Sequence, residues 1–439
     1  MPRRHDAERL DALHAYLDSL RPHSRLALDN GTGTVELPSA PALLASKEVG
    51  EVSREAAPCK GRALLPPEGV CLLLLWRDDE TFLSRNFAGP LRLAGTGTDG
   101  AWVLQADQLY ARVVSEPFTR PSWALAVPVN DTVRISHGEP GSVARVAALI
   151  NNLDLSGRQR PLTVQAGTVA VRFRPAPTDP LLRDLHAARV LRTASLATFE
   201  FAAWPGAAEE ELVAFCENVS TLCTYATGTH NGVRLVTLST AAGRVVRQIV
   251  RSPIEGPRAT RDVLSDGWPL GDCETLFRQG FEEHVRMRRS PLPWRKLASY
   301  CGAIEDGAFL EQKFSNLMMA VEFFIRTSLL EADPVRAPTF SQMKLTDLLG
   351  AARTRLGWVI PGHYGRNDLV RLLRNAVAHG GELPTRDSAE FRSMFDKWRL
   401  FLFRRVLIRL GYTGRVLSPH HGCASASAVD DFSEEHNSF

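Results

Sequence analysis

The sequence predicts an α+β protein, in which a β-rich antiparallel N-terminal region is followed by an all-α helical bundle. Between residues 26 and 175, short apolar runs of strand length alternate with turn-forming Gly, Pro and Thr. From residue 272 onward, apolar residues instead recur at helical spacing over long segments. Of the 439 residues, 44% are hydrophobic and 23% are charged, so the chain can bury the cores of two or three globular domains.

These changes of pattern divide the chain into five expected segments. We expect a short helix over residues 1–25, a β-rich region over 26–252, a Pro- and Gly-bearing connector over 253–271, a helical domain over 272–417 and a disordered tail over 418–439. The β-rich region can be read as one domain or as two subdomains. The tail is small, polar and acidic, with too little apolar material to fold alone.

The β-rich region is expected to form strands at the following apolar runs: Val70–Trp76, Leu91–Ala94, Tyr110–Ser115, Ala124–Val127, Thr132–Ser136 and Leu162–Phe173. A strand, helix, strand, strand order is expected to follow, at Thr198–Trp204, Glu209–Cys223, Val233–Ser239 and Arg244–Arg251. Two Gly-Thr-Gly-Thr repeats, at 31–34 and 95–98, are interpreted as hairpin turns. Neither opens a helix after a strand or contains the Gly-Lys-Thr of a phosphate-binding loop.

The helical domain is expected to contain helices at Cys273–Arg288, Pro291–Cys301, Phe309–Leu330, Ala337–Leu349 and Ala389–Leu410, with a loop at Leu356–Tyr364. The helix that starts at Phe309 carries one apolar stripe: Leu310, Phe314, Leu317, Val321, Phe324 and Ser328. In the last helix, we expect six apolar residues to face inward: Phe391, Phe395, Trp398, Leu402, Val406 and Leu410. Arg399, Arg405 and Arg409 are expected to face outward, with Gly411 ending the helix.

Composition argues against several classes of protein. No apolar run reaches the length of a membrane span and the sequence does not start with an apolar signal region, so we expect a cytoplasmic protein that makes no membrane contact. The seven cysteines are odd in number and show no Cys-x2-Cys spacing, so neither a disulfide framework nor a metal or cofactor site is expected. Cys216 and Cys223 are expected to pack as small apolar groups on a helix. His420, His421 and Cys423 are interpreted as part of the tail.

Positive charge is concentrated in the C-terminal part. The whole chain has a formal net charge of +3, whereas residues 282–416 contain 22 Lys and Arg against 14 Asp and Glu, a surplus of 22 − 14 = 8. This surplus favours a polyanionic partner such as RNA, although distributed charge also serves solubility.

The stretch Leu372–Gly381, which reads LLRNAVAHGG, is the strongest candidate for a chemical site. On a helix its apolar residues share one face, while Arg374, Asn375 and His379 fan across the other. A guanidinium binds phosphate in a bidentate manner and an imidazole exchanges protons near neutral pH, so this trio suits anion binding with proton transfer. The spacing alone is weak, because Arg-x4-His also occurs at Arg9 and at Arg415. The alternative is that Arg374 and His379 only decorate a helix end.

The same stretch, preceded by a long helix carrying Glu322 and followed by the Phe391–Gly411 helix, resembles the HEPN superfamily of helical ribonuclease domains. Within that superfamily it is similar to the ApeA-like group of anti-phage defence proteins, which also join a long N-terminal region to a C-terminal HEPN domain. The resemblance covers about residues 290–416. It implies a homodimer or higher oligomer that cuts RNA without metal at a cleft between protomers, in abortive infection.

The resemblance also assigns expected roles. Arg374 would bind phosphate, His379 would transfer protons and Asn375 would position both, while Glu322 would support them from the preceding helix. Two further residues, Arg366 and Arg371, are candidates for RNA binding. RNA is the expected substrate, with tRNA as one candidate, and a phage-derived molecule would trigger the enzyme through the β-rich sensor or platform region. The alternative function is a non-catalytic, dimerising scaffold protein with a degenerate HEPN domain.

Overall fold

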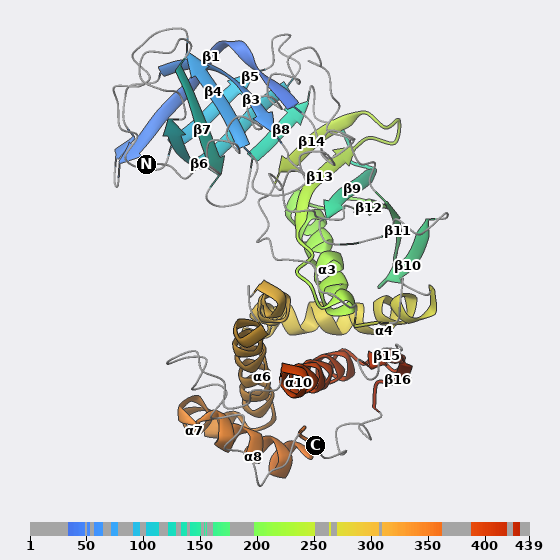
Figure 1. The fold of residues 1–439 in the computed structure, drawn as a ribbon. Coiled ribbons are helices and arrows are strands. Elements are labelled where there is room, and N and C mark those ends of the chain that lie inside the picture. The colour runs from blue at the N-terminus through green and yellow to red at the C-terminus, as the bar shows by residue number, and fades with distance from the viewer. Residues whose placement is uncertain are drawn as a thin grey trace. The chain divides into compact units, whose positions relative to one another are not determined.

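The computed structural model shows the α+β organisation that the sequence predicts, with antiparallel strands first and helices after them (Figure 1). It describes the following residues: 34–48, 51–52, 57–64, 72–77, 91–96, 102–113, 122–128, 133–137, 141–150, 153, 155, 161–175, 197–250, 263–264, 270–306, 310–361, 388–418 and 425–430. The helix expected over 1–25 lies outside them.

The chain divides into two compact units, and each unit is made of several separate pieces of the chain. A single boundary in the expected connector, residues 253–271, does not separate them. The first unit contains residues 1–161, 172–216 and 232–255. The second contains residues 162–171, 217–231 and 256–439, and it therefore combines the C-terminal helices with two short pieces of the β-rich region. One boundary, between residues 216 and 217, falls inside the helix Glu209–Thr227. Apolar periodicity in the sequence does not predict a boundary within a helix.

The first unit contains the strands β1 (Thr34–Glu48), β2 (Glu51–Val52), β3 (Ala57–Leu64), β4 (Leu72–Arg77), β5 (Leu91–Thr96), β6 (Trp102–Val113), β7 (Ser122–Pro128) and β8 (Val133–His137). Successive antiparallel pairings join β6, β5, β1, β3, β4 and β7, and β7 pairs back to β6. Expected strands at five runs are confirmed as β4 to β8, while β1, β2 and β3 were not predicted. β5 ends at Thr96, within the second Gly-Thr-Gly-Thr repeat, and pairs antiparallel with β6. Residues 97–101 lie outside the described ranges, so the predicted turn itself stays a prediction.

The same unit continues with β9 (Arg145–Ile150), β12 (Ala197–Ala202), β13 (Val233–Ser239) and β14 (Val245–Val250), whose predicted positions are confirmed for all except β9. Alternate residues of β12 are buried. Phe199 lies 5.4 Å from Phe173, and Phe201 lies 4.6 Å from Phe215 of helix α3 (Glu209–Thr227), measured between ring centroids. These aromatic contacts bind α3 to the sheet and supply much of the local core.

One expected strand is divided in the structure. Leu162–Phe173 forms β10 (Leu162–Ala166) and β11 (Val169–Pro175), separated by a turn at Gly167, whose φ is +62°. The turn shifts the alternation: Val164 is buried before it, whereas Val171 and Phe173 are buried after it. A left-handed backbone favours glycine, and a side chain at 167 would collide with Glu282.

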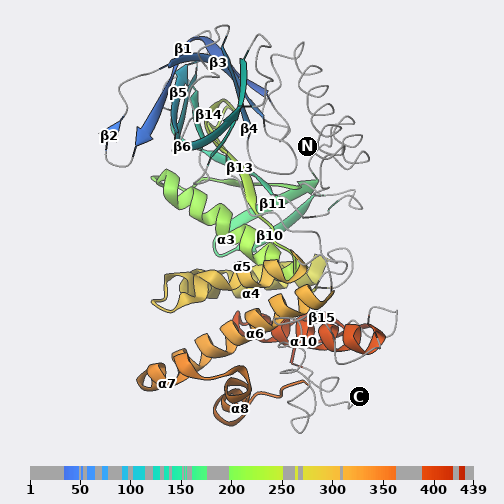
Figure 2. The same ribbon diagram turned by 60° about the vertical axis from the view of Figure 1, so that its left-hand side comes forward.

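The second unit is a helical bundle whose helices follow the predicted order (Figure 2). Its elements are α4 (Leu270–Arg289), η3 (Pro293–Lys296), α5 (Leu297–Gly302), η4 (Ala303–Asp306), α6 (Leu310–Ala332), η5 (Pro334–Arg336), α7 (Ala337–Gln342), α8 (Leu345–Leu356) and α10 (Ser388–Arg409). The stripe predicted on α6 is buried from Phe314 to Ser328. The expected helix at Ala337–Leu349 is instead two helices, α7 and α8.

The helix α10 is buried on nearly every side. Its six predicted core residues are all buried, and so are Phe401, Phe403 and the side chain of Arg404. Arg399, Arg405 and Arg409, which the sequence had suggested would face solvent, are instead half-buried. Arg399 pairs with Glu305, Arg405 lies over the ring of Trp358 after α8, and Arg409 pairs with Glu331 of α6. Neighbouring segments therefore cover three polar residues of α10 that the sequence placed in solvent.

Two glycines allow close packing in the helical unit. Gly228, at φ +68°, ends α3, and a side chain there would lie 2.3 Å from a guanidinium nitrogen of Arg399. Gly302 of α5 lies against His230, whose Cβ would be 2.7 Å from an added Cβ. The residues directly after α3, Gly228 to His230, therefore pack closely against both α5 and α10.

The predicted disordered tail contains ordered structure at its start. β15 (Arg415–Ser418) pairs antiparallel with β16 (Ser425–Ala428), and Val429 is buried. Val416 of β15 is buried as well, so apolar packing accompanies the main-chain pairing of these two strands. Leu417 also donates its backbone N–H to the carbonyl of Val263.

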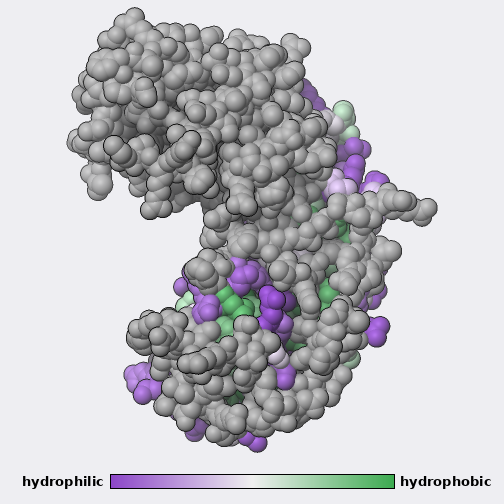
Figure 3. Space-filling model, in the orientation of Figure 1, coloured by the Kyte–Doolittle hydropathy of each residue, from purple (hydrophilic) through white to green (hydrophobic). Residues whose placement is uncertain are grey.

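Figure 3 shows hydrophilic and hydrophobic described residues side by side on one face of the helical unit. Large apolar side chains exposed among the described residues are Met319, Val335 and Ile408. None of the described helices combines the length and the apolar composition that crossing a membrane requires.

Candidate functional site

The residues of the predicted catalytic site, Arg374, Asn375 and His379, lie outside the described part of the chain, as do Arg366 and Arg371. They fall between Pro361 and Ser388, after α8 and before α10. Their mutual geometry therefore stays a prediction. The structure describes the residues on either side of this segment, up to Pro361 and from Ser388 onward.

The described residues on both sides of that segment contact α6. On the entering side, the ring of Trp358 stacks on Phe324 at 5.6 Å, between centroids. On the returning side, Phe391 packs on Phe314 at 5.3 Å. Phe314 and Phe324 are ten residues apart on α6, about 15 Å along the helix axis. The described residues that flank the segment with the Arg-x4-His motif thus pack along one face of α6.

The entry point is fixed further by α10. Trp358 meets Phe401 at 6.3 Å, and the guanidinium of Arg405 lies 5.0 Å from the Trp358 ring centroid. Arg405 also donates to the carbonyl of Val359 at 3.4 Å. A cation over an indole ring is attracted by the π electrons, so this contact orders the loop after α8.

Glu322, the predicted supporting carboxylate, lies on α6 in the interval between Phe314 and Phe324. Its side chain is half-buried and forms an ion pair of 2.9 Å with Arg326, one helical turn further on. Arg326 in turn donates to the carbonyls of Phe340 and Met343, at 3.1 Å for the latter. In the described residues, Glu322 therefore orients Arg326, which attaches the α7–α8 connection to α6. A role toward Arg374 or His379 stays a prediction.

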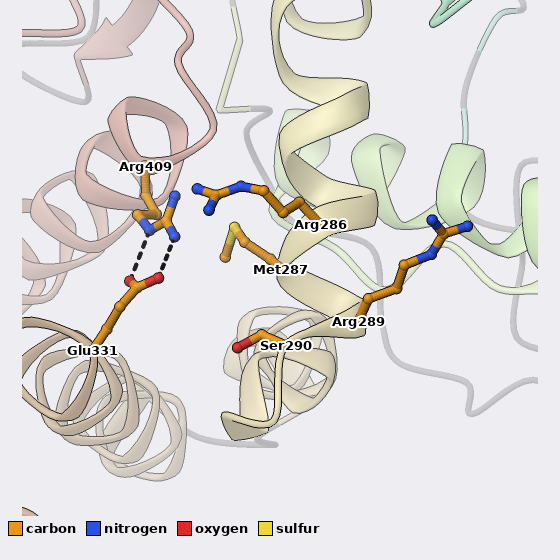
Figure 4. Close-up of a pocket in the computed structure, with 6 residues that line it drawn as sticks. All are labelled: Arg286, Met287, Arg289, Ser290, Glu331 and Arg409. Atoms are coloured by element: carbon orange, nitrogen blue, oxygen red, sulfur yellow. Dashed lines mark hydrogen bonds and ion pairs between the residues drawn. The ribbon is translucent and has the colours of Figure 1, made fainter. Parts of the chain in front are cut away.

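A second site, which sequence reasoning missed, is a pocket of about 340 Å³ lined by Arg286, Met287, Arg289, Ser290, Glu331 and Arg409 (Figure 4). It lies where α4, α6 and α10 end. The sequence signal was present in the run Arg286-Met-Arg-Arg-Ser290. Glu331 and Arg409 are distant in sequence from that run, so only the fold joins them to it.

Several buried titratable groups in the helical unit lie away from this pocket. His284 is only 2% exposed and its ring lies edge-on to Tyr225, with 5.9 Å between centroids. Burial, with a smaller contribution from Arg288, lowers the pKa of His284 to about 3. Burial also raises the pKa values of the Cys223 and Cys301 thiols. These groups stay neutral near pH 7, and Cys216 and Cys223 pack as apolar groups, as predicted.

Within the described ranges, no three His, Cys, Asp or Glu side chains are grouped so that they could hold a metal ion. Comparisons of the chain with protein-family models, curated proteins and solved structures give no match.

Proposed function

We propose that the chain is a metal-independent endoribonuclease of the HEPN type, which acts as a homodimer in anti-phage defence. The observation that carries this proposal is that the described residues on either side of the 362–387 segment pack on α6, Trp358 on Phe324 and Phe391 on Phe314. A motif helix held between two long helices is the arrangement that the resemblance implies. The basic surplus of residues 282–416 supports RNA as the substrate.

The proposed chemistry uses a nucleophile that RNA carries itself. The 2′-hydroxyl next to the scissile phosphate can attack phosphorus, provided that a base removes its proton and an acid protonates the leaving 5′-oxygen. His379 would move these protons, and Arg374 would bind the phosphate and offset its developing charge. One imidazole cannot readily serve as base and acid in the same turnover, so two copies related by a two-fold axis would supply two imidazoles.

The contacts of Trp358 and Phe391 with α6 suggest a role for Glu322, which lies on the same helix. Glu322 lies on the same helix between the two anchoring phenylalanines, and its carboxylate is oriented by Arg326 at 2.9 Å. From there it could hold a proton-bearing nitrogen of His379 or a donor of Arg374, as carboxylates do behind functional imidazoles. In this proposal Glu322 is a positioning residue rather than a catalytic one.

The decisive experiment is an RNA cleavage assay on His379→Ala and Arg374→Ala. We expect each substitution to lower the rate at least about a hundredfold, the usual contribution of a general acid–base group. The chain offers a matched control in Arg415 and His420, which have the same spacing. His420→Ala should cut RNA at the rate of the unmodified protein, and EDTA should leave that rate unchanged.

Other outcomes would separate the alternatives. Equal cleavage by His379→Ala and His420→Ala would refute the assigned site, and loss of activity in EDTA would refute a metal-independent mechanism. A well-folded dimer with no cleavage of any RNA would instead favour the scaffold function with a degenerate HEPN domain. Mixing His379→Ala with active protein tests the shared site, because heterodimers should lose activity as well.

A further inference from the structure

Arginine predominates in the lining of the pocket at the ends of α4, α6 and α10, where Arg286, Arg289 and Arg409 stand beside one carboxylate, Glu331. The guanidinium of Arg289 points away from the others in Figure 4. Arg286 and Arg409 pair with Glu283 just outside the lining, and Arg409 also pairs with Glu331. Two neighbouring guanidinium groups beside an open pocket of about 340 Å³ favour a small anion.

Two guanidinium groups are held side by side in this pocket by one carboxylate. Glu283 accepts two hydrogen bonds from Arg286, at 2.7 and 2.6 Å, and it also pairs with Arg409. Burial acts to raise the pKa of Glu283, but hydrogen bonds from Arg286 and Arg409 outweigh it and hold the pKa below its usual value. Glu283 is therefore ionised near neutral pH and keeps the two like charges together.

The remaining carboxylate, Glu331, is the exchangeable partner of Arg409. Its contacts to Arg409 measure 3.2 and 2.6 Å, yet 36% of its side chain is exposed. It occupies the last turn of α6, where the carbonyl end of the helix disfavours a negative charge. An exposed ion pair of this kind contributes little and exchanges readily with other ions.

Donors converge on the position that Glu331 occupies. In Figure 4 the guanidinium of Arg286 and the hydroxyl of Ser290 point to the side of the pocket where Arg409 and Glu331 lie, whereas the guanidinium of Arg289 points away. Arg286 uses Nε and Nη2 on Glu283, which leaves its Nη1 hydrogens. Ser290 accepts a hydrogen bond from the backbone of Leu292 at 3.2 Å and keeps its own O–H to donate.

We infer that this pocket binds a phosphate group, which takes the place of the Glu331 carboxylate and bridges Arg286, Arg409 and Ser290. Phosphate has the advantage over Glu331 because it can accept from two guanidinium groups at once, whereas Glu331 contacts only Arg409 among the described arginines of the pocket. The phosphate could belong to a free nucleotide or inorganic phosphate, or to RNA. The inference uses no residue of the Arg374–His379 motif, so it goes beyond the proposed nuclease.

The test measures binding without cleavage, in full-length protein carrying His379→Ala so that RNA stays intact. The probes are inorganic phosphate, followed by thermal unfolding, and one short oligoribonucleotide with a 5′-phosphate or a 5′-hydroxyl, followed by fluorescence anisotropy. We expect phosphate to raise the melting temperature. A preference for the 5′-phosphorylated oligoribonucleotide identifies a terminal phosphate as the ligand, and equal binding of both identifies the RNA backbone.

Two substitutions in the pocket should change affinity in opposite directions. Glu331→Gln removes the competing carboxylate and should tighten binding by roughly two- to fivefold, the range of one exposed charge pair. Arg286→Gln removes one cation and should weaken binding by a similar factor. For the oligoribonucleotide, the slope of the logarithm of the binding constant against the logarithm of the salt concentration should become shallower by about 0.7. The Arg286 side chain is 69% exposed, so the protein should fold without it.

Matched controls lie close to the pocket but outside its lining. Asp333→Asn removes the same charge two residues after Glu331, at a carboxylate that pairs with Arg336 and Arg355 instead. Arg336→Gln is the corresponding control for Arg286→Gln. The inference is overturned if either pocket variant behaves like its control, or if phosphate leaves the melting temperature unchanged. RNA cleavage by His379→Ala tests the proposed nuclease site separately. The phosphate pocket and the nuclease site can therefore be refuted independently of each other.

Discussion

Two of the clusters of basic residues and glutamate in the described part of the helical unit share their chemistry and differ in exposure. In the first, the Glu305 carboxylate, 5% exposed, pairs with Lys313 at 2.7 Å and with Arg399 at 3.5 Å. In the second, Glu283 and Glu331 pair with Arg286 and Arg409 around an open pocket. We refer to them as the Glu305 cluster and the Glu331 cluster.

The difference in exposure predicts a difference in role. Charges in the Glu305 cluster have lost most of their water, so each depends on its partners and the cluster is structural. Charges in the Glu331 cluster keep contact with water, so any pair can open at little cost and admit an outside anion. The same residue types therefore stabilise the fold in one place and offer a binding site in the other.

The largest effect is expected from Glu305→Gln. It removes the carboxylate shared by Lys313 and Arg399 and leaves two cations near each other with little solvent. Breaking a buried ion pair from one side costs roughly 3–5 kcal/mol. Urea unfolding at pH 7 should show this loss in the free energy of unfolding. A loss below about 1 kcal/mol would mean that the Glu305 cluster behaves as if it were solvated, and the comparison would fail.

A second prediction extends the comparison to a buried group that stays uncharged. The folded pKa of His284 is about 3, against an ordinary value of 6.5, so between these pH values the unfolded chain binds a proton that the folded chain does not. Stability from this group is present above pH 6.5 and is lost as pH falls toward 3. The slope is about 1.4 kcal/mol per pH unit, or roughly 2–3 kcal/mol between pH 6.5 and 4.5.

His284→Gln separates this contribution from that of the carboxylates that titrate in the same range. The measurement is the free energy of unfolding at several pH values from 4.5 to 7, and the readout is its slope rather than its absolute value. The variant should show a smaller slope than the unmodified protein between pH 4.5 and 6.5. Identical slopes would show that His284 is protonated in the folded state.

The comparison also shows what the sequence can and cannot reveal. Long periodic helices such as α6 and α10 and the strand β13 were predicted closely, because a local apolar pattern determines them. The pattern of α10 gave its core residues but misjudged Arg399, Arg405 and Arg409. A single helix does not indicate whether neighbours cover its polar face as well.

The two candidate sites differ for the same reason. The Arg374–His379 motif is contiguous and can be recognised in the sequence, although its geometry lies outside the described residues. The pocket brings together Arg286, Glu331 and Arg409 from the ends of three helices, and no local pattern predicts such an assembly. Likewise, the turn at Gly167 was missed because apolar alternation continues on both sides of it.

The smallest effect is expected from Glu331→Gln on stability. The side chain is 36% exposed and Arg409 keeps its pairing with Glu283, so the free energy of unfolding should change by less than about 1 kcal/mol. Glu331→Gln and Glu305→Gln should be measured in the same urea titration. The losses in free energy of unfolding then show how much each cluster contributes to stability. A loss as large as that of Glu305→Gln would mean that Glu331 holds α6 to α10. An anion could then not replace it without loosening the bundle, and the pocket would be structural.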